Sequence, residues 1–312
     1  MGLKIGVVGV GAIGGFLTAY LCAAGNSLHV LARQRTCEAI RTNGLRLVTG
    51  GREIVVHPEI VSEDPTTVGE VDLILFTVKG QDTAEAAAMM RPMVGPDTLV
   101  LSFQNGLFGV EQLAEMFCAA RVMAGVTYVP AVVRAPGVVH HTGAVRRFVF
   151  GPCDGTTPPS SVALAFADAG REAGLEMVLL ETPMPEIWAK FVMLTPFHLI
   201  SCMTRLPLGG WIDVAATRSI YRDAMQEVAD VAAACGITLP DGLVARNLAF
   251  SRDTADRGTR ASMLEDLERG SALELEATVG WLIATARRRG VSTPIHDIGH
   301  AMLAPHVNGA RA

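Results

Sequence analysis

Three lysines occur in the chain, Lys4, Lys79 and Lys190, whereas the other 23 of its 26 basic residues are arginines. Arginine does not release its proton in a protein, and its planar guanidinium cannot replace a compact ammonium group. A lysine retained in this background therefore indicates a task that arginine cannot perform. Lys190 is the main candidate, because an ammonium group can protonate a developing alkoxide and stabilise it by its charge. A nearby carboxylate such as that of Glu274 could orient the ammonium group.

A glycine motif lies at the start of the chain. The hexapeptide Gly9-Val10-Gly11-Ala12-Ile13-Gly14 has GxGxxG spacing and follows a predicted strand and opens a predicted helix. In that context the first glycine permits a tight turn, the second lets backbone approach a pyrophosphate, and the third allows close helix–strand packing. The helix N-terminus then supplies N–H groups and a positive dipole end to the phosphates. The motif predicts dinucleotide binding by Gly9, Gly11, Ala12, Ile13 and Gly14; the alternative is a glycine-rich packing turn.

The end of the second predicted strand indicates which dinucleotide binds. Sites for NAD or FAD place Asp or Glu about 20 residues after the glycines, where it binds ribose hydroxyls. Here that point reads Leu31-Ala32-Arg33-Gln34-Arg35, with no carboxylate before Glu38. An arginine suits a 2′-phosphate, so we predict NADPH as the cofactor, with Arg33 as its principal contact. The alternative is a solvated Arg33 and a site that accepts either NADH or NADPH.

The first half of the chain alternates short apolar runs with helical stretches, which is typical of a parallel sheet covered by helices. Predicted strands cover 4–8, 28–32, 71–78, 98–103, 122–133, 138–150 and 177–180, with a glycine-turn hairpin over 45–56 and helices over 12–24, 83–90 and 161–173. Lys79 and Asn105 follow two of these strands. The carboxyl ends of strands in an open α/β sheet face the ligand crevice, so we expect both side chains there.

Thr182-Pro183-Met184-Pro185 is the predicted linker, because two prolines in three residues prevent a helix from crossing it. Beyond it the strand signals fade, and helical patterns cover 187–203, 213–234, 243–252 and 273–289. We therefore predict an α/β fold with two domains. They are an N-terminal Rossmann dinucleotide-binding domain over 1–182 and an all-helical substrate and catalytic domain over 183–312. The substrate is expected in the cleft between them.

Further short motifs follow one another along the chain. They are Val78-Lys79, Gln104-Asn105-Gly106, Pro136-Gly137, His141-Thr142-Gly143, Trp188-Ala189-Lys190 and Ser262-Met263-Leu264-Glu265-Asp266, followed by Glu274. In this order, and with the glycine motif, they resemble the ketopantoate reductase family over nearly the whole chain. The resemblance implies a Rossmann domain, a helical C-terminal domain and NADPH-dependent reduction of a 2-oxo acid to a 2-hydroxy acid. For ketopantoate, that reaction belongs to pantothenate biosynthesis.

The resemblance also implies roles for single residues. Lys190 falls on the family's catalytic lysine, and Glu274 falls on the carboxylate that engages lysine or substrate. Ser262 falls on a substrate-binding serine. Asn105 and Lys79 fall on residues beside the nicotinamide and the substrate. We therefore expect proton donation from Lys190, with Glu274 holding the ammonium group.

The helix after the predicted linker departs from the family pattern. The family carries asparagines four and eight positions after the catalytic lysine, whereas this chain has Leu194 and His198. Residues 190, 194 and 198 share one helix face, so both side chains are expected to line the substrate pocket. A site built to hydrogen-bond a hydroxyl discriminates strongly for it, so the loss of both amides argues against ketopantoate itself. The alternative for His198 is a histidine packed within the helix.

Composition limits the partners. A net charge of -5 gives no general electrostatic case for binding nucleic acid or an anionic membrane. The six cysteines are scattered without a CxxC pair, as expected for reduced thiols of a cytoplasmic protein. We expect no signal peptide, because a strand pattern begins at once, and no membrane span. We also expect no metal site, because His296 and His300 have no third ligand at a suggestive spacing. The sequence does not give the oligomeric state, and a homodimer is possible.

Three functions are compatible with the sequence. The first is an NADPH-dependent reductase of ketopantoate or of a more apolar ketone or oxo acid. The second is an NADPH-binding sensor without turnover. The third is a β-hydroxy acid or opine-type dehydrogenase with the same two-domain plan. In every case the partner is a small molecule.

Overall fold

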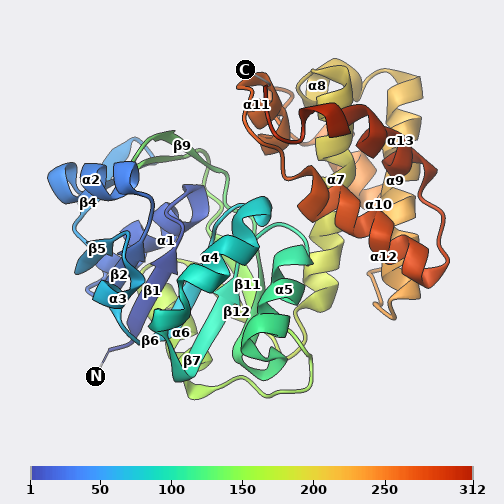
Figure 1. Ribbon diagram of the computed structural model, residues 1–312. Coiled ribbons are helices and arrows are strands. Elements are labelled where there is room, and N and C mark those ends of the chain that lie inside the picture. The colour runs from blue at the N-terminus through green and yellow to red at the C-terminus, as the bar shows by residue number, and fades with distance from the viewer. Residues whose placement is uncertain (1, 311–312) are drawn as a thin grey trace. The chain divides into compact units, whose positions relative to one another are not determined.

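The computed structural model describes residues 2–310 and contains two compact units, Met1–Pro183 and Met184–Ala312. The first is an α/β unit and the second, over its described residues, is helical, which confirms the predicted fold class (Figure 1).

The α/β unit is built on an eight-stranded sheet, counted over the described residues, in the order β12-β11-β8-β7-β6-β1-β2-β5. Neighbouring strands are parallel except β8 and β11, which are antiparallel. The strands are β1 (Lys4–Val8), β2 (Ser27–Leu31), β5 (Ile60–Ser62), β6 (Val71–Phe76), β7 (Val94–Ser102), β8 (Val122–Thr127), β11 (Arg147–Pro152) and β12 (Glu176–Leu179). The chain runs from β1 outward to β2 and β5, then returns to β6 on the other side of β1. Ligands bind at such a change of direction in open α/β sheets.

The central strands are buried on both faces, so they read as continuous apolar runs rather than as alternating ones. In β1, Ile5 and Val7 are inaccessible to solvent and belong to one core cluster with residues of α1 and α6, while Val8 is buried outside that cluster. The helices of this unit are α1 (Ala12–Ala23), α2 (Gln34–Asn43), α3 (Pro65–Val68), α4 (Thr83–Met89), α5 (Phe108–Phe117) and α6 (Ser161–Glu172), with short 3₁₀ turns η1 (Gly80–Asp82), η2 (Arg91–Met93) and η3 (Ala119–Arg121).

A second, smaller sheet packs on helix α1, which follows the glycine motif. Its strands, in spatial order among the described residues, are β4 (Arg52–Val56), β3 (Leu45–Thr49), β10 (Val138–His141) and β9 (Ala131–Ala135). Helix α1 approaches this sheet closely, since a Cβ on Gly15 would lie 2.7 Å from Val139 Cγ2. The predicted hairpin over 45–56 is confirmed as the antiparallel pair β3 and β4.

The predicted strands over 122–133 and 138–150 are wrong in extent. Each divides into two strands, and the two parts belong to different sheets: β8 and β11 to the large one, β9 and β10 to the small one. The breaks fall at residues that interrupt a strand. Pro130 lies between β8 and β9, and Gly143, with φ of +102°, lies between β10 and β11.

The helical unit contains α7 (Met184–Thr204), α8 (Leu208–Trp211), α9 (Ala215–Ala234), α10 (Leu243–Asp253), α11 (Ser262–Glu268), the π-helix η4 (Glu276–Gly280), α12 (Trp281–Arg289), α13 (Pro294–Leu303) and the 3₁₀ turn η5 (Ala304–His306). The helix predicted over 273–289 is therefore wrong in part, because its first half contains a π-helical turn. α11 and α13 were not predicted as helices; both are short, and α11 lies among glycine and charged residues.

Helix α7 begins inside the segment predicted as a linker. Its first residue is Met184, so Pro185 occupies the first turn, where a missing N–H costs no hydrogen bond. Within residues 2–310, α7 is the one helix long and apolar enough to cross a membrane by length and composition, yet most of it is buried. Leu199 and Cys202 of α7 belong to the unit's core cluster with residues of α11, η4, α12 and α13. α7 is thus the central helix of this unit.

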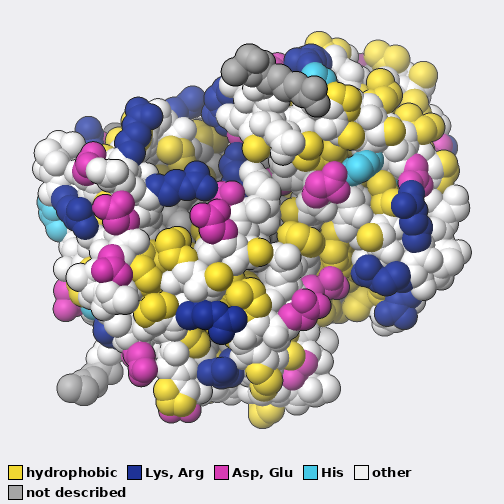
Figure 2. All heavy atoms as spheres, viewed as in Figure 1, with side chains coloured by type: hydrophobic (Ala, Val, Ile, Leu, Met, Phe, Trp, Pro, Cys, Tyr) yellow, Lys and Arg dark blue, Asp and Glu magenta, His cyan; other side chains and the backbone are white. Residues whose placement is uncertain are grey.

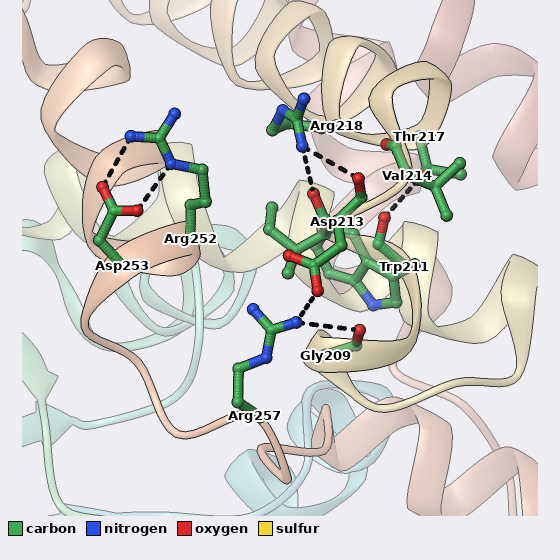
Figure 3. A network of polar contacts seen from close by, with 10 residues as sticks. Gly209, Trp211, Asp213, Val214, Thr217, Arg218, Arg252, Asp253 and Arg257 are labelled. Atoms are coloured by element: carbon green, nitrogen blue, oxygen red, sulfur yellow. Dashed lines mark hydrogen bonds and ion pairs between the residues drawn. The ribbon is translucent and has the colours of Figure 1, made fainter.

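A polar network fixes the loop that leads into α11 (Figure 3). Arg257 in this loop pairs with Asp213, and its Nη2 also donates to the Gly209 carbonyl at 3.4 Å. The Leu208 N–H donates to the Thr259 carbonyl at 2.9 Å. The loop is therefore held against α8, just before Ser262 begins α11.

The charged side chains are dispersed on the face drawn in Figure 2, where basic and acidic groups are interspersed with apolar ones. The net charge of -5 is not gathered into one acidic field on that face.

Candidate active site

The glycine loop after β1 has the geometry of a pyrophosphate cradle. Gly9 has φ of +87°, which glycine adopts without strain. A Cβ on Gly14 would lie 2.3 Å from the Gly9 carbonyl oxygen, so the third glycine is required for packing. A Cβ on Gly11 would meet nothing within 4 Å. The second glycine thus borders open space, which is where a phosphate group must approach.

The same loop is supported from β6 and opens a suitable helix. The Thr77 N–H donates to the Val8 carbonyl at 2.9 Å, and its hydroxyl donates to the Gly9 carbonyl at 2.6 Å. At the other end of the loop, Gly11 is the N-cap of α1, no side chain caps the helix, and its first turn has no acidic residue. The N–H groups of Ala12 and Ile13 therefore suit an anion. These residues fit a bound dinucleotide.

Arg33 follows β2 and is the N-cap residue of α2. Its side chain is 82% exposed, and its Nη2 donates to Asp82 Oδ2 at 2.8 Å. Asp82 belongs to η1, after β6. Because β1 lies between β2 and β6, this ion pair joins the loops on either side of the glycine loop.

Lys79 and Asn105 lie where the sequence predicts them, after the carboxyl ends of β6 and β7. Lys79 is exposed and precedes η1, whereas Asn105 is half-buried and precedes Gly106, whose φ is +77°. Gln104 links the two loops, since its Nε2 donates to the Val78 carbonyl at 3.1 Å and to Thr83 Oγ1 at 2.8 Å. The two predicted side chains are thus held on adjacent, tied loops.

In the helical unit, Lys190 and Glu274 interact electrostatically. Burial lowers the pKa of Lys190 to about 8, while the negative charge of Glu274 acts in the opposite direction. Lys190 is half-buried on α7, and Glu274 is half-buried just before the π-helix. A lysine with this pKa can be a cation that gives up its proton near neutral pH, which an ordinary lysine does poorly.

Three aromatic rings join the elements that carry this pair. Trp188 and Phe191 flank Lys190 on α7, and their centroids lie 5.6 Å and 5.8 Å from that of Trp281. Trp281 follows the π-helix directly, and all three rings are buried. The edge-on and tilted packing of these rings fixes the start of α12 against α7, and thereby the segment after Glu274.

His198 lies two turns beyond Lys190 on the same helix. It is buried, and burial, reinforced by the charge of Lys190 and opposed by that of Asp266, lowers its pKa to about 4. It is therefore neutral at physiological pH. Its Nδ1 is buried and has no hydrogen-bond partner within the described residues. Leu194, between the two, is half-buried.

Helix α11 brings Ser262 and Asp266 onto one face, since they are four residues apart. Ser262 is exposed at the first position of the helix. Asp266 is buried and accepts a bond from Arg269 Nη2 at 3.1 Å. The helical unit thus assembles Lys190, Glu274, His198 and Asp266 into one electrostatically coupled group.

Sequence reasoning missed the supporting residues Thr77, Asp82, Gln104 and Asp266. Gln104 and Thr77 follow buried strands directly, a position that could have marked them. Asp266 stands inside a motif that the sequence singled out for its serine. Nothing local to Asp82 indicates its contact with Arg33, which depends on the order of strands in the sheet.

Three other histidines have hydrogen-bond or ion-pair partners outside the group around Lys190. His141 is held by Thr49 Oγ1 at 2.9 Å and by the Val145 carbonyl at 2.9 Å. His296 and His300 pair separately with carboxylates, those of Glu227 at 2.6 Å and Glu276 at 2.9 Å. Each therefore has a structural partner of its own.

A pyrophosphate cradle on a Rossmann sheet, followed by a helical unit with a lysine–carboxylate pair, defines a class of oxidoreductases that use a nicotinamide cofactor. Residues 5–155 match the family model of ketopantoate reductase PanE/ApbA, and residues 183–306 match the model of its C terminal. The chain belongs to the ketopantoate reductase PanE/ApbA family.

Known relatives cover almost the whole chain. A 2-dehydropantoate 2-reductase of Mesorhizobium japonicum is 30% identical over 316 residues, 95% of this chain and 95% of the relative. The crystal structure of a PanE/ApbA family ketopantoate reductase from Ralstonia eutropha JMP134 superposes with a TM-score of 0.88 at 30% identity, over 97% of this chain and 98% of that one. A D-mandelate dehydrogenase solved with NADH and anilino(oxo)acetate shares the fold, with a TM-score of 0.84, 23% identity, and coverage of 97% and 98%.

Proposed function

We propose that the chain is an NADPH-dependent reductase of a 2-oxo acid, with Lys190 as the proton donor. The observation that carries the proposal is the pKa of Lys190, which burial lowers to about 8 while the negative charge of Glu274 opposes that lowering. Together with the family membership, it supports an acid catalyst for carbonyl reduction. Glu274 would hold the ammonium group toward the substrate oxygen.

When bound, NADPH supplies the hydride. Gly9, Gly11 and Gly14 with the N–H groups of Ala12 and Ile13 would hold its pyrophosphate. Arg33 would bind its 2′-phosphate, because a guanidinium binds phosphate by two parallel hydrogen bonds. Lys79 and Asn105 would contact the nicotinamide end of the cofactor.

Asn105 and Ser262 would position the substrate, and the re-lined face of α7 would select it. Leu194 adds apolar bulk where the family carries an amide. His198 offers a neutral imidazole whose buried Nδ1 has no hydrogen-bond partner within the described residues. These two residues favour a 2-oxo acid whose side chain is more apolar than that of ketopantoate, while ketopantoate itself remains the reference substrate.

The test is oxidation of NADPH against ketopantoate and a panel of bulkier, more apolar 2-oxo acids and ketones. We expect turnover, with the highest kcat/KM for an apolar member. Efficient turnover of ketopantoate instead would place the enzyme in pantothenate biosynthesis. Cofactor binding with no oxidation across the panel would contradict the proposal and indicate a sensor, and equal KM values for NADH and NADPH would refute the cofactor preference.

The His198→Asn variant tests the selecting face of α7. We expect kcat/KM for the best panel substrate to fall about tenfold, the equivalent of one hydrogen bond, with cofactor affinity unchanged. The exposed His306 gives a matched control, since His306→Asn should leave kcat/KM as it is. An unchanged kcat/KM in His198→Asn would mean that this imidazole only packs within the helix.

The second and third glycines of the motif, Gly11 and Gly14, should respond differently to replacement by alanine. Gly11→Ala places its methyl group in open space, so the melting temperature should hold while the Kd for NADPH rises at least about tenfold. Gly14→Ala forces a methyl group against the Gly9 carbonyl and should cost about 1–3 kcal/mol of stability. Thermal melts and fluorescence titration with NADPH measure both. Wild-type NADPH affinity in a folded Gly11→Ala protein would mean that the pyrophosphate does not lie over this loop.

A further inference from the structure

The contact between Arg33 and Asp82 lies in the part of the α/β unit that would receive the adenosine end of a dinucleotide. Arg33 follows β2, Asp82 follows β6, and their 2.8 Å ion pair bridges the two loops that flank the glycine loop after β1. Ribose recognition in this fold takes place at the end of the second strand. The side chain that would read the 2′ position is thus already held by a carboxylate.

That carboxylate also fills a gap in the sequence pattern. The end of β2 has no Asp or Glu to accept a hydrogen bond from a ribose 2′-hydroxyl. Asp82, in the turn η1 after β6, places a carboxylate oxygen 2.8 Å from the guanidinium of Arg33, which is the residue two positions after the end of β2. An oxygen at this point can accept from a 2′-hydroxyl, whereas it repels a 2′-phosphate and competes with it for the guanidinium.

We propose that Asp82 is a cofactor-specificity residue that narrows the preference for NADPH over NADH. The proposal rests on the function proposed above, in which Arg33 binds the 2′-phosphate. With NADPH, the Arg33 guanidinium must leave Asp82 or be shared with it. With NADH, the ion pair stays and Asp82 accepts from the 2′-hydroxyl.

Removing the carboxylate should not disturb the fold. The Arg33 side chain is 82% exposed, and exposed ion pairs contribute little to stability. Asp82 precedes α4, but its side chain makes no capping bond there. Its N–H donates to the Lys79 carbonyl, and Asp82→Asn retains that backbone bond.

Calorimetric titration with two adenosine fragments isolates this effect from catalysis. Adenosine 2′,5′-bisphosphate carries the 2′-phosphate, whereas ADP carries a 2′-hydroxyl. We expect Asp82→Asn to bind the bisphosphate about three- to tenfold more tightly, as for removal of one nearby like charge, and ADP no more tightly. The ratio of the two Kd values is therefore the measured quantity.

Glu85 provides the matched control, because it is an exposed acid one turn further along α4. Glu85→Gln removes the same charge and should leave the ratio unchanged. An unchanged ratio in Asp82→Asn, or an equal shift in both variants, would overturn the proposal, since the effect would then be absent or a general property of surface charge.

Arg33→Ser separates this inference from the proposed function. Loss of bisphosphate binding in Arg33→Ser, together with an unchanged ratio of the two Kd values in Asp82→Asn, would refute only the role of Asp82. Equal affinity of the wild-type protein and Arg33→Ser for the bisphosphate would refute the 2′-phosphate site itself, and the role of Asp82 with it. Titration of intact NADPH and NADH should repeat the fragment result.

Discussion

Replacing Lys190 by alanine is expected to lower kcat by about 10³- to 10⁴-fold, because the variant loses both the proposed proton donor and the positive charge that would lie beside the developing alkoxide. The loss should fall on kcat and not on cofactor binding, since the glycine loop and Arg33 belong to the α/β unit and Lys190 to the helical unit. Steady-state oxidation of NADPH gives kcat, and fluorescence titration gives the cofactor Kd.

Lys190→Arg distinguishes the two contributions of the lysine. Arginine retains the charge and does not release a proton, so this variant should recover little of the lost kcat if proton donation dominates. Recovery to near the wild-type rate would show that charge alone is sufficient. Near-normal turnover of Lys190→Ala would exclude the residue as the acid.

The second large effect is expected at Glu274 and is best seen as a pH profile. In the proposed mechanism, carbonyl reduction needs the protonated ammonium of Lys190, whose pKa is lowered to about 8. The rate of reduction should therefore be level below pH 8 and fall about tenfold per pH unit above it. The carboxylate of Glu274 raises the pKa of Lys190, so Glu274→Gln should move the break to lower pH. At pH 8 we expect kcat to fall about 10- to 100-fold.

Glu276→Gln is the control for that experiment. Glu276 lies two residues further on, is exposed, and pairs with His300. Its removal should leave the break in the profile where it is in the wild type. A break that stays near pH 8 in Glu274→Gln would mean that another group sets the profile. A shift of the break to higher pH would contradict the sign of the interaction.

The backbone of the glycine loop could be predicted in detail because its requirements are local. Gly9 needs a positive φ, Gly14 must pack against the preceding turn, and Gly11 must leave space, and all three follow from the order strand, turn, helix. The α/β class of the first unit and the helical class of the second were predicted correctly for a similar reason. Over ten residues or more, apolar residues recur with a different period in a strand than in a helix. The binding and catalytic roles of all the site residues, those of the glycine loop included, stay predictions.

What could not be predicted depends on contacts between distant segments. The partner of Arg33 is Asp82, 49 residues away. The two meet because their loops follow β2 and β6, the strands that lie on either side of β1 in the sheet. Sequence also places Pro185 in a linker, whereas the structure uses it in the first turn of α7, because both environments tolerate a missing N–H. The π-helical turn after Glu274 has the same residue pattern as an ordinary helix, so periodicity alone hides it.

The small sheet on α1 has a consequence for the order in which the chain folds. β1, α1 and β2 are neighbours in sequence, but the parallel pair β3 and β10 joins segments that meet across 92 residues at Thr49 and His141. Closing so long a loop costs more conformational entropy than docking α1 on the large sheet. The part of the small sheet formed by β9 and β10 therefore packs on α1 late in folding, after the local hairpin of β3 and β4. Substitutions between α1 and β10 should accordingly speed unfolding more than they slow refolding.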